Sequence, residues 1–459
     1  LMDFILLMIL SGLMLAWIKR LYSRALGLKR TTRHRPFDLL ILTVLWLIFP
    51  LRFLAESFTS GIRGGGSFLT HTAGDFFNSF LPIEQLAYPA WWAYSSALGL
   101  FFLLLPFSRY MHIPTEIVYI FLKNWGVRQG RQFTAFSQFQ LYACSRCGIC
   151  IDQCQLGSSL GMKDTQPVYF LKKIRHHKEY ATLTNNCLMC GRCEAACPVD
   201  LRLNALRLSQ RPDYTRITKS TYDYLPDQAA SQGKVAYFAG CMGHLTPGVI
   251  RAMETILTKA SVDYAFIDKN GGVCCGRPQL LSGNQNATSV IIEKNTKILT
   301  DTGAELLVTS CPICYKSFKE NYHLPMRVMH HTEYLQLLIK QGKLRLRPSQ
   351  MKTVFHNPCE LGRGCDVHTA PDEVLKAVSQ KLDTAYDGKK SLCCGGSLAN
   401  QHITAQQRTQ ISRDALNSYL TYQPDILVTA CPLCKKTFTK TESPVPVQDI
   451  AELVAESIE

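Results

Sequence analysis

One pattern of five cysteines that occurs twice constrains the fold of this chain more than any other feature. The cysteines are Cys241, Cys274, Cys275, Cys311 and Cys314 in the first copy, and Cys359, Cys393, Cys394, Cys431 and Cys434 in the second. Equivalent positions lie 118 residues apart (241 to 359), 119 apart (274 to 393) and 120 apart (311 to 431). So constant an offset indicates a duplicated domain. Each copy supplies one thiol more than a tetrahedral zinc ion or a four-cysteine cluster requires.

Short apolar runs ahead of the cysteines predict buried strands. Residues 304–310 and 425–430 lead directly into Cys-Pro-x-Cys, and residues 234–240 and 352–357 end just before Cys241 and Cys359. Proline suits the first position of a helix, so each Cys-Pro-x-Cys should form a strand-to-helix turn. Open α/β sheets bind their ligands at the carboxyl ends of strands. We therefore expect two α/β domains that carry their thiols at that edge.

The adjacent cysteines and their spacing resemble the CCG domains of the heterodisulfide reductase family, over residues 234–459. The run His356-Asn357-Pro358-Cys359 is also similar to the family's sequence ahead of its second copy. The resemblance implies that all five cysteines of each copy bind a noncubane [4Fe-4S] cluster, and that the two clusters can reduce a disulfide. Zinc would explain one Cys-x-x-Cys but not the adjacent pairs. Structural disulfides would need an oxidising compartment, which the topology below argues against.

The second copy is expected to hold the reactive end of the chain. Adjacent cysteines in a strand point to opposite faces, so Cys393 and Cys394 can reach one cluster only if the backbone turns sharply. Gly395 and Gly396 supply that freedom, whereas the first copy has only Gly276, and its site is expected to act as a relay. The expected catalytic residues are Cys359, Cys393, Cys394, Cys431 and Cys434.

Length and charge set further limits. With 459 residues, the chain has room for about three domains. The net charge of +15 suggests nucleic acid, but the basic residues do not form a stripe interleaved with aromatic residues. No nucleic-acid partner is expected, because many of these charges flank apolar segments instead.

Three apolar segments predict a transmembrane anchor over residues 1–124, with spans at about 1–18, 39–58 and 89–107. Seven Lys and Arg residues lie between 19 and 35, whereas the stretch 59–88 contains only Arg63. The positive-inside rule then puts the first loop and everything after the third span in the cytoplasm, at the inner membrane. Arg52 and Glu56 are one helical turn apart in the second span and can pair.

Residues 103–116 (LLLPFSRYMHIPTE) resemble the last membrane helix of the nitrate reductase gamma family of cytochrome b subunits. That helix carries two haem-ligating histidines in the family. His112 matches one of them, but Tyr94 occupies the position of the other. A haem b within this chain is therefore not expected. His112 either shares a haem with a neighbouring subunit or is an interfacial polar residue.

Residues 125–211 carry two cysteine runs with the spacing of a two-cluster ferredoxin. The fourth cysteine of each run serves the other cluster, so two cubane [4Fe-4S] clusters are expected. One would use Cys144, Cys147, Cys150 and Cys197, and the other Cys187, Cys190, Cys193 and Cys154. The first run ends on Gln155 where proline is usual. A helix within residues 163–180 favours an α-helical ferredoxin, and residues 209–233 are the expected linker.

The predicted fold is thus multidomain: an α-helical transmembrane anchor, a mainly α ferredoxin domain, and duplicated α/β CCG domains at 234–345 and 346–459. This order indicates an electron path that ends at a disulfide or thiol site, in a chain that resembles the CCG-domain iron–sulfur subunits of the heterodisulfide reductase family. Expected partners are membrane cytochrome or quinone-reactive subunits of a hetero-oligomeric complex, and a cytoplasmic redox partner or disulfide substrate. The alternative is a non-catalytic relay for a flavoprotein dehydrogenase of the 2-hydroxy acid, glycerol-3-phosphate or electron-transfer flavoprotein type. The chain has no Gly-x-Gly-x-x-Gly motif, so a flavin would belong to another subunit.

Overall fold

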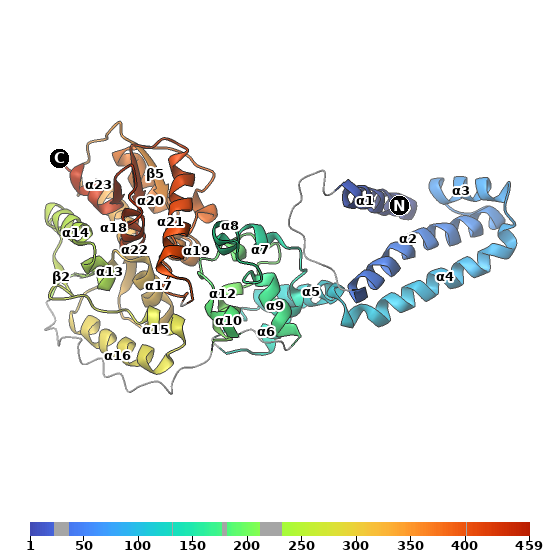
Figure 1. Ribbon diagram of the computed structural model, residues 1–459, viewed down its shortest axis with the longest axis horizontal. Coiled ribbons are helices and arrows are strands. Elements are labelled where there is room, and N and C mark those ends of the chain that lie inside the picture. The colour runs from blue at the N-terminus through green and yellow to red at the C-terminus, as the bar shows by residue number, and fades with distance from the viewer. Residues whose placement is uncertain (23–35, 131, 177–180, 212–231, 401) are drawn as a thin grey trace. The chain divides into compact units, whose positions relative to one another are not determined.

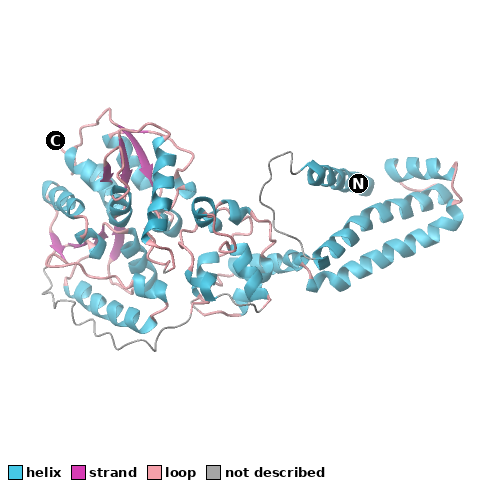
Figure 2. Cartoon of the chain, viewed as in Figure 1, coloured by secondary structure: helices cyan, strands magenta, loops and turns pink. Residues whose placement is uncertain are grey.

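The computed structural model divides the chain into two compact units, and each is described by itself. It describes residues 1–22, 36–130, 132–176, 181–211, 232–400 and 402–459. Residues 1–128 and 135–148 form a helical unit, and residues 129–134 and 149–459 form a second unit that contains all the strands described. Figure 1 traces the chain, and Figure 2 distinguishes its helices from its strands. This division is compatible with the predicted multidomain organisation, whose domain bounds stay a prediction.

The helical unit contains the predicted anchor. Its elements are α1 (Met2–Tyr22), α2 (Pro36–Arg63), α3 (Phe68–Asn78), α4 (Ile83–Leu104), η1 (Leu105–Phe107), η2 (Arg109–Met111), α5 (His112–Asn124) and α6 (Ala135–Ala143). By length and composition, residues 36–63 and 83–107 are long and apolar enough to cross a membrane, and residues 2–18 form a shorter apolar helix. The stretch 59–88 is not the simple loop of the sequence prediction, because it contains α3 and the ends of α2 and α4. Most of the predicted basic loop, residues 23–35, lies outside the described residues.

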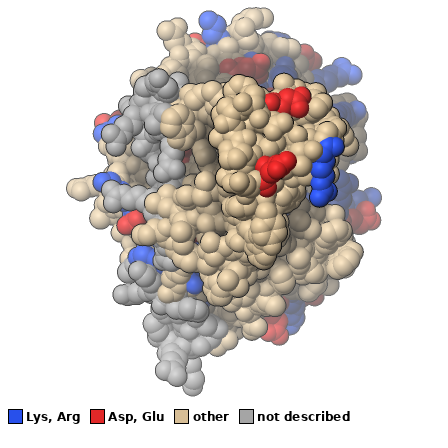
Figure 3. Space-filling view, turned by 90° about the vertical axis from the view of Figure 1, so that its right-hand side faces the viewer, with Lys and Arg blue, Asp and Glu red and all other residues tan. Residues whose placement is uncertain are grey.

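Polar contacts and small residues fix α3 in this unit. The carboxylate of Asp3 accepts hydrogen bonds from the backbone N–H of Leu69 (3.0 Å) and of Thr70 (2.9 Å) at the start of α3. A Cβ on Gly74 would lie 2.6 Å from the carbonyl oxygen of Ser57, so the backbones of α2 and α3 touch. The face of the molecule in Figure 3 shows few charged side chains.

The ferredoxin-like part of the second unit is built from short helices. They are α7 (Ile149–Asp152), α8 (Gln155–Leu160), α9 (Pro167–Arg175), α10 (Ala181–Asn185), α11 (Arg192–Ala195) and α12 (Leu203–Leu208). Arg207 is buried and lies over the ring of Phe170, with 4.2 Å between the guanidinium carbon and the ring centroid. Its guanidinium also donates to the carbonyl oxygens of Leu183 and Thr165, and so joins α9, α10 and α12. The helix expected within residues 163–180 is α9.

Each CCG copy is a four-stranded parallel sheet with helical crossovers. The first contains β1 (Val235–Phe238), α13 (Gly240–His244), α14 (Pro247–Lys259), β2 (Tyr264–Phe266), α15 (Arg277–Ser282), α16 (Gln285–Asp301), β3 (Leu306–Thr309), α17 (Pro312–Asn321), β4 (Arg327–His330) and α18 (His331–Lys340). The second contains β5 (Lys352–His356), α19 (Cys359–Cys365), α20 (Thr369–Val378), β6 (Gln380–Lys381), η3 (Gly388–Lys390), α21 (Ala405–Leu420), β7 (Ile426–Thr429), α22 (Pro432–Thr439), β8 (Val447–Asp449) and α23 (Ile450–Glu456). The strand orders, β2-β1-β3-β4 and β6-β5-β7-β8, are equivalent, as the duplication predicts.

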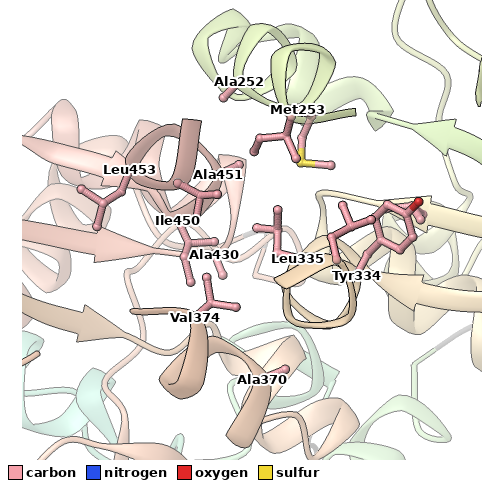
Figure 4. Packing of buried hydrophobic residues seen from close by; sticks show 14 of the residues in the cluster. Ala252, Met253, Tyr334, Leu335, Ala370, Val374, Ala430, Ile450, Ala451 and Leu453 are labelled. Carbon is pink, nitrogen blue, oxygen red and sulfur yellow. The ribbon is translucent and has the colours of Figure 1, made fainter. Parts of the chain in front are cut away.

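The two copies share one hydrophobic core. Helices α14 and α18 of the first copy pack against α20 and α23 of the second, and Figure 4 shows their buried side chains meeting. Met253, Leu335, Val374 and Ile450 are almost completely buried there. Since one continuous core stabilises both sheets, the two sites at their edges are held in a fixed relation.

Candidate iron–sulfur sites

The thiols of each CCG copy gather where the strand order of its sheet reverses. In the first copy this point lies between β1 and β3, and in the second between β5 and β7. Cys241 follows β1, and Cys311 follows β3 as the cap of α17. Cys359 and Cys431 occupy the equivalent positions after β5 and β7. In doubly wound α/β sheets this crevice is the ligand-binding position.

In the first copy, the sulfurs lie close enough together to interact in pairs. The interacting pairs are Cys241 with Cys274, Cys275 with Cys314, and Cys311 with Cys314. The interaction with Cys241 lowers the pKa of the Cys274 thiol to about 7, which favours the thiolate that binds iron. The interaction with Cys314, together with backbone N–H groups at the start of α17, lowers the pKa of Cys311. Gly240 leaves room for this group, since a Cβ there would lie 2.9 Å from the sulfur of Cys314.

In the second copy, Cys393 is the central thiol. Its sulfur interacts with those of Cys359 and Cys394, and the sulfur of Cys434 interacts with those of Cys394 and Cys431. The interactions with Cys393 and Cys434 hold the pKa of Cys394 well below the ordinary value. All five predicted ligands of this copy therefore form one connected group.

The turn that brings adjacent cysteines to one site is the same in both copies. Gly395 has φ +84° and Gly276 has φ +79°, a left-handed conformation that suits glycine. A Cβ on Gly395 would also lie 2.8 Å from the carbonyl oxygen of Arg408. Gly396 does not have a positive φ, so the sharp turn needs one glycine, not two. The expected difference between the copies at this point is therefore wrong.

The chemistry of the thiols fits iron–sulfur clusters. Backbone N–H groups of Gly276 and Gly396 lie 3.4 Å from the sulfurs of Cys274 and Cys394, and such bonds to sulfur tune cluster potentials. Among the described residues, no three of His, Cys, Asp or Glu have the arrangement that would hold a single metal ion. In a cluster the thiolates are shared among several irons and do not bind one ion, so the sulfurs need not converge on one point.

A buried ion network lies beside both sites. Glu360, which follows Cys359, accepts from Arg277 (3.4 Å) and from Lys316 (3.1 Å), both of the first copy. Burial alone would raise the pKa of Glu360, but these two cations lower it to about 2. Nothing in the sequence marked these three residues as a network, because its members are 83 and 44 positions apart (277 to 360, 316 to 360).

The ferredoxin-like thiols of the second unit also lie near one another. Cys154 is close enough to Cys187 and Cys190 for their charges to interact, as expected if the fourth cysteine of the first run serves the second run. The N–H of Met189 bonds with the sulfur of Cys187 at 3.3 Å. Cys144 and Cys147 belong to the helical unit, and their assignment to a cluster with Cys150 and Cys197 stays a prediction.

The ferredoxin-like domain contacts the second CCG copy where Cys190 lies next to Cys393. The sulfurs of Cys190 and Cys393 lie close together, and the interaction with Cys393 lowers the pKa of Cys190 to about 6. Cys431 in turn is near enough to Cys311 for their charges to interact, so the second copy also faces the first. Cys393 of the second copy thus lies beside a ferredoxin-like thiol, and the order in which the two copies act, with the first copy as the relay, stays a prediction.

A hollow that is partly open to solvent covers the second copy. All five of its cysteines line this hollow, with Leu188 and Met189 of the ferredoxin-like domain and Pro312 and Ile313 of the first copy. Most of the other lining residues are apolar, so the hollow offers a cluster a largely dry environment with an opening to solvent.

Two residues at the candidate haem positions have other contacts. Nδ1 of His112 lies 2.8 Å from the carbonyl oxygen of Arg109. Tyr94 is within hydrogen-bonding distance of Arg52, which pairs with Glu56 at 2.9 Å as the spacing predicted. The role of His112 toward a haem stays a prediction.

Comparison with known proteins agrees with this geometry. The model of the cysteine-rich domain called CCG matches residues 235–319 and 353–439, and that of a 4Fe-4S dicluster domain matches residues 140–201. The chain is 23% identical over 395 residues to the D subunit of the dihydromethanophenazine:CoB–CoM heterodisulfide reductase of Methanosarcina acetivorans, covering 72% of this chain and 96% of that protein.

Two bacterial relatives are similar over smaller parts of their own length. The probable iron-sulfur-binding oxidoreductase FadF of Bacillus subtilis is 25% identical, covering 70% of this chain and 46% of that protein. The EtfAB:quinone oxidoreductase of Syntrophomonas wolfei is 26% identical, covering 45% of this chain and 32% of that protein. The chain is therefore an iron–sulfur protein with two CCG domains and a 4Fe-4S dicluster domain.

Proposed function

We propose that this CCG-domain iron–sulfur chain is a membrane-bound electron-transfer subunit of a respiratory oxidoreductase. It passes electrons between the quinone pool or a membrane cytochrome partner and a disulfide or thiol at the second CCG copy, on the cytoplasmic side. The apolar helices α2 and α4 support the membrane attachment. The names of the relatives, a heterodisulfide reductase subunit and two oxidoreductases, support the redox role and a complex of several subunits.

One observation carries this proposal: the loop of Cys190 is held against the second copy, where Arg363 donates to the carbonyl oxygen of Cys190 at 2.6 Å and Leu188, Met189 and Cys393 line the same hollow. A proposed cubane ligand thus lies beside a proposed noncubane ligand. Electrons that reach the ferredoxin-like domain therefore have a short path to the second copy.

Residues of the second copy form the site at which the disulfide is reduced. When bound, iron–sulfur clusters transfer electrons singly, whereas reduction of a disulfide takes two electrons and two protons and gives two thiols. Cys359, Cys393, Cys394, Cys431 and Cys434 hold the cluster of the second copy, and the hollow above them admits a substrate sulfur from solvent. The proposed cluster of the first copy, near Cys311, is the second source of an electron.

The test uses the full complex purified from membranes, with a reduced viologen as donor and a low-molecular-weight disulfide as acceptor. We expect two thiols to be released for each disulfide consumed, and no release from a Cys434→Ser complex. Wild-type complex that consumes no disulfide, while its clusters are fully reduced by the viologen, would overturn the disulfide-reductase assignment.

The second candidate is a relay that carries electrons from a flavoprotein to quinone without substrate chemistry of its own. The similarity to FadF and to the EtfAB:quinone oxidoreductase favours it. In this case a flavoprotein co-purifies with the chain, its reduced flavin reduces a quinone analogue, and disulfide is not consumed.

A further inference from the structure

The side chain of Gln155 forms a two-way hydrogen bond with the backbone of Cys393. The amide Nε2 donates to the carbonyl oxygen of Cys393 at 3.0 Å, and the backbone N–H of Cys393 donates to Oε1 at 2.7 Å. Both residues are buried, with exposed fractions of 5% and 2%. The primary amide satisfies both backbone groups of Cys393 at once, much as a neighbouring strand would.

This residue type is unusual for its position. The cysteine run that Gln155 follows normally ends on proline, and the other run here does so, at Pro198. Gln155 is the first residue of α8, where proline would be well suited. Proline could not make either of the two bonds, so the exchange has a direct structural consequence in the contact with the second copy.

Further hydrogen bonds hold the loop that carries Cys190 next to the second CCG copy. The guanidinium of Arg363 donates to the carbonyl oxygen of Cys190 at 2.6 Å, and also to that of Ser391 at 2.6 Å. The hydroxyl of Ser397 donates to the carbonyl oxygen of Leu188 at 2.6 Å. These bonds hold the Cys190 loop against the loop that carries Cys393, and Gln155 holds Cys393 itself.

We propose that Gln155 is a positioning residue of the electron path, which clamps the backbone of Cys393 so that its sulfur stays in contact with that of Cys190. This inference rests on the proposed electron-transfer function. It assigns the contact between Cys190 and Cys393 as the place where electrons enter the CCG domains. In each transfer one electron leaves the cubane site of Cys187, Cys190, Cys193 and Cys154, and the second-copy site gains it. No covalent bond forms or breaks.

Electron tunnelling falls steeply with distance, so loss of the clamp should slow this step without removing a ligand. Gln155→Met keeps the length of the side chain but makes neither bond. Gln155→Glu keeps the oxygen that accepts from Cys393 and loses the donor. The matched control is Gln166→Met, since Gln166 is also buried in the ferredoxin-like domain, and its side chain donates to the nearby carbonyl oxygen of Met162 at 2.8 Å and to no other residue that the structure describes.

The experiment measures transfer between clusters in the full complex by flash reduction and rapid-freeze electron paramagnetic resonance. We expect Gln155→Met to keep its iron and its reducible cubanes, while transfer slows about tenfold to a hundredfold, the usual cost of an ångström-scale misplacement. Gln155→Glu should fall between Gln155→Met and wild type, and Gln166→Met should match wild type.

Wild-type transfer rates in Gln155→Met would overturn the proposal. Loss of iron from the ferredoxin-like domain in that variant would also overturn it, because Gln155 would then be a structural support. The readout does not depend on the final acceptor, so a wild-type complex that fails to reduce disulfides would refute the proposed function and leave this test intact.

Discussion

Cys393 links more of the proposed redox path than any single neighbour, because its sulfur lies close to those of Cys190, Cys359 and Cys394. Its side chain is buried, with an exposed fraction of 2%. A serine at this position would keep the size of the side chain but supply an alcohol, which is a much poorer ligand for iron than a thiolate.

We therefore expect Cys393→Ser and Cys394→Ser to abolish electron delivery to the soluble partner while both cubanes stay reducible. Electron paramagnetic resonance would follow the cubanes, and turnover with the physiological acceptor would follow delivery. Cys365→Ser is the control, since Cys365 lies outside the repeated pattern and packs at the edge of the shared core. Full turnover in both cysteine variants would mean that the second copy is neither terminal nor required.

Glu360 is expected to stabilise the fold through its ion pairs with Arg277 and Lys316. Glu360→Gln leaves Arg277 and Lys316 buried without this carboxylate, which should cost about 3 kcal/mol of unfolding free energy. Because the folded pKa of Glu360 is lowered to about 2, its contribution is fully present above pH 4.5 and is lost as the pH falls toward 2. Denaturant unfolding at neutral pH measures the loss, and Glu373→Gln, at an exposed pair with Lys340, should leave stability unchanged. Equal stability of the two variants would contradict this account.

At the scale of elements, the sequence was most informative where local pattern decides structure. The four runs that precede the cysteines form β1, β3, β5 and β7, and proline opens α17 and α22 after the predicted strand-to-helix turns. Helix α3 was missed, because its first turn is stabilised by Asp3, more than 60 residues earlier in the chain. The Gln155 bond with Cys393 and the Glu360 network were missed for the same reason: tertiary contacts, not periodicity, create them.

The elements also give a prediction for membrane topology, which rests on the asymmetry of charge around α2 and α4. Ser79, an exposed residue just after α3, should face the periplasm. In intact cells, Ser79→Cys should react with a membrane-impermeant maleimide. Val290→Cys, exposed on α16, should react only after permeabilisation. The reverse labelling pattern would invert the topology.

At the scale of the whole molecule, duplication produces two sites, and their neighbours make them different. Both sheets have the same strand order and the same glycine turn. Only the second copy has a thiol close to one of the ferredoxin-like domain among the described residues, through Cys393 and Cys190. In the electron path proposed above, electrons from that domain enter the CCG domains at the second copy.

The four proposed cluster sites predict the iron content of the chain. Variants that each remove one site test the contribution of that site. Two cubane and two noncubane clusters give about sixteen irons per chain, four per cluster. The double variant Cys187→Ala, Cys193→Ala should retain about twelve by losing one cubane, and Cys275→Ala, Cys314→Ala should also retain about twelve by losing the first-copy cluster. Iron analysis of protein purified without oxygen measures these values. A wild-type value near eight would mean that the CCG sites hold no [4Fe-4S] clusters, since the ferredoxin-like domain alone accounts for that amount.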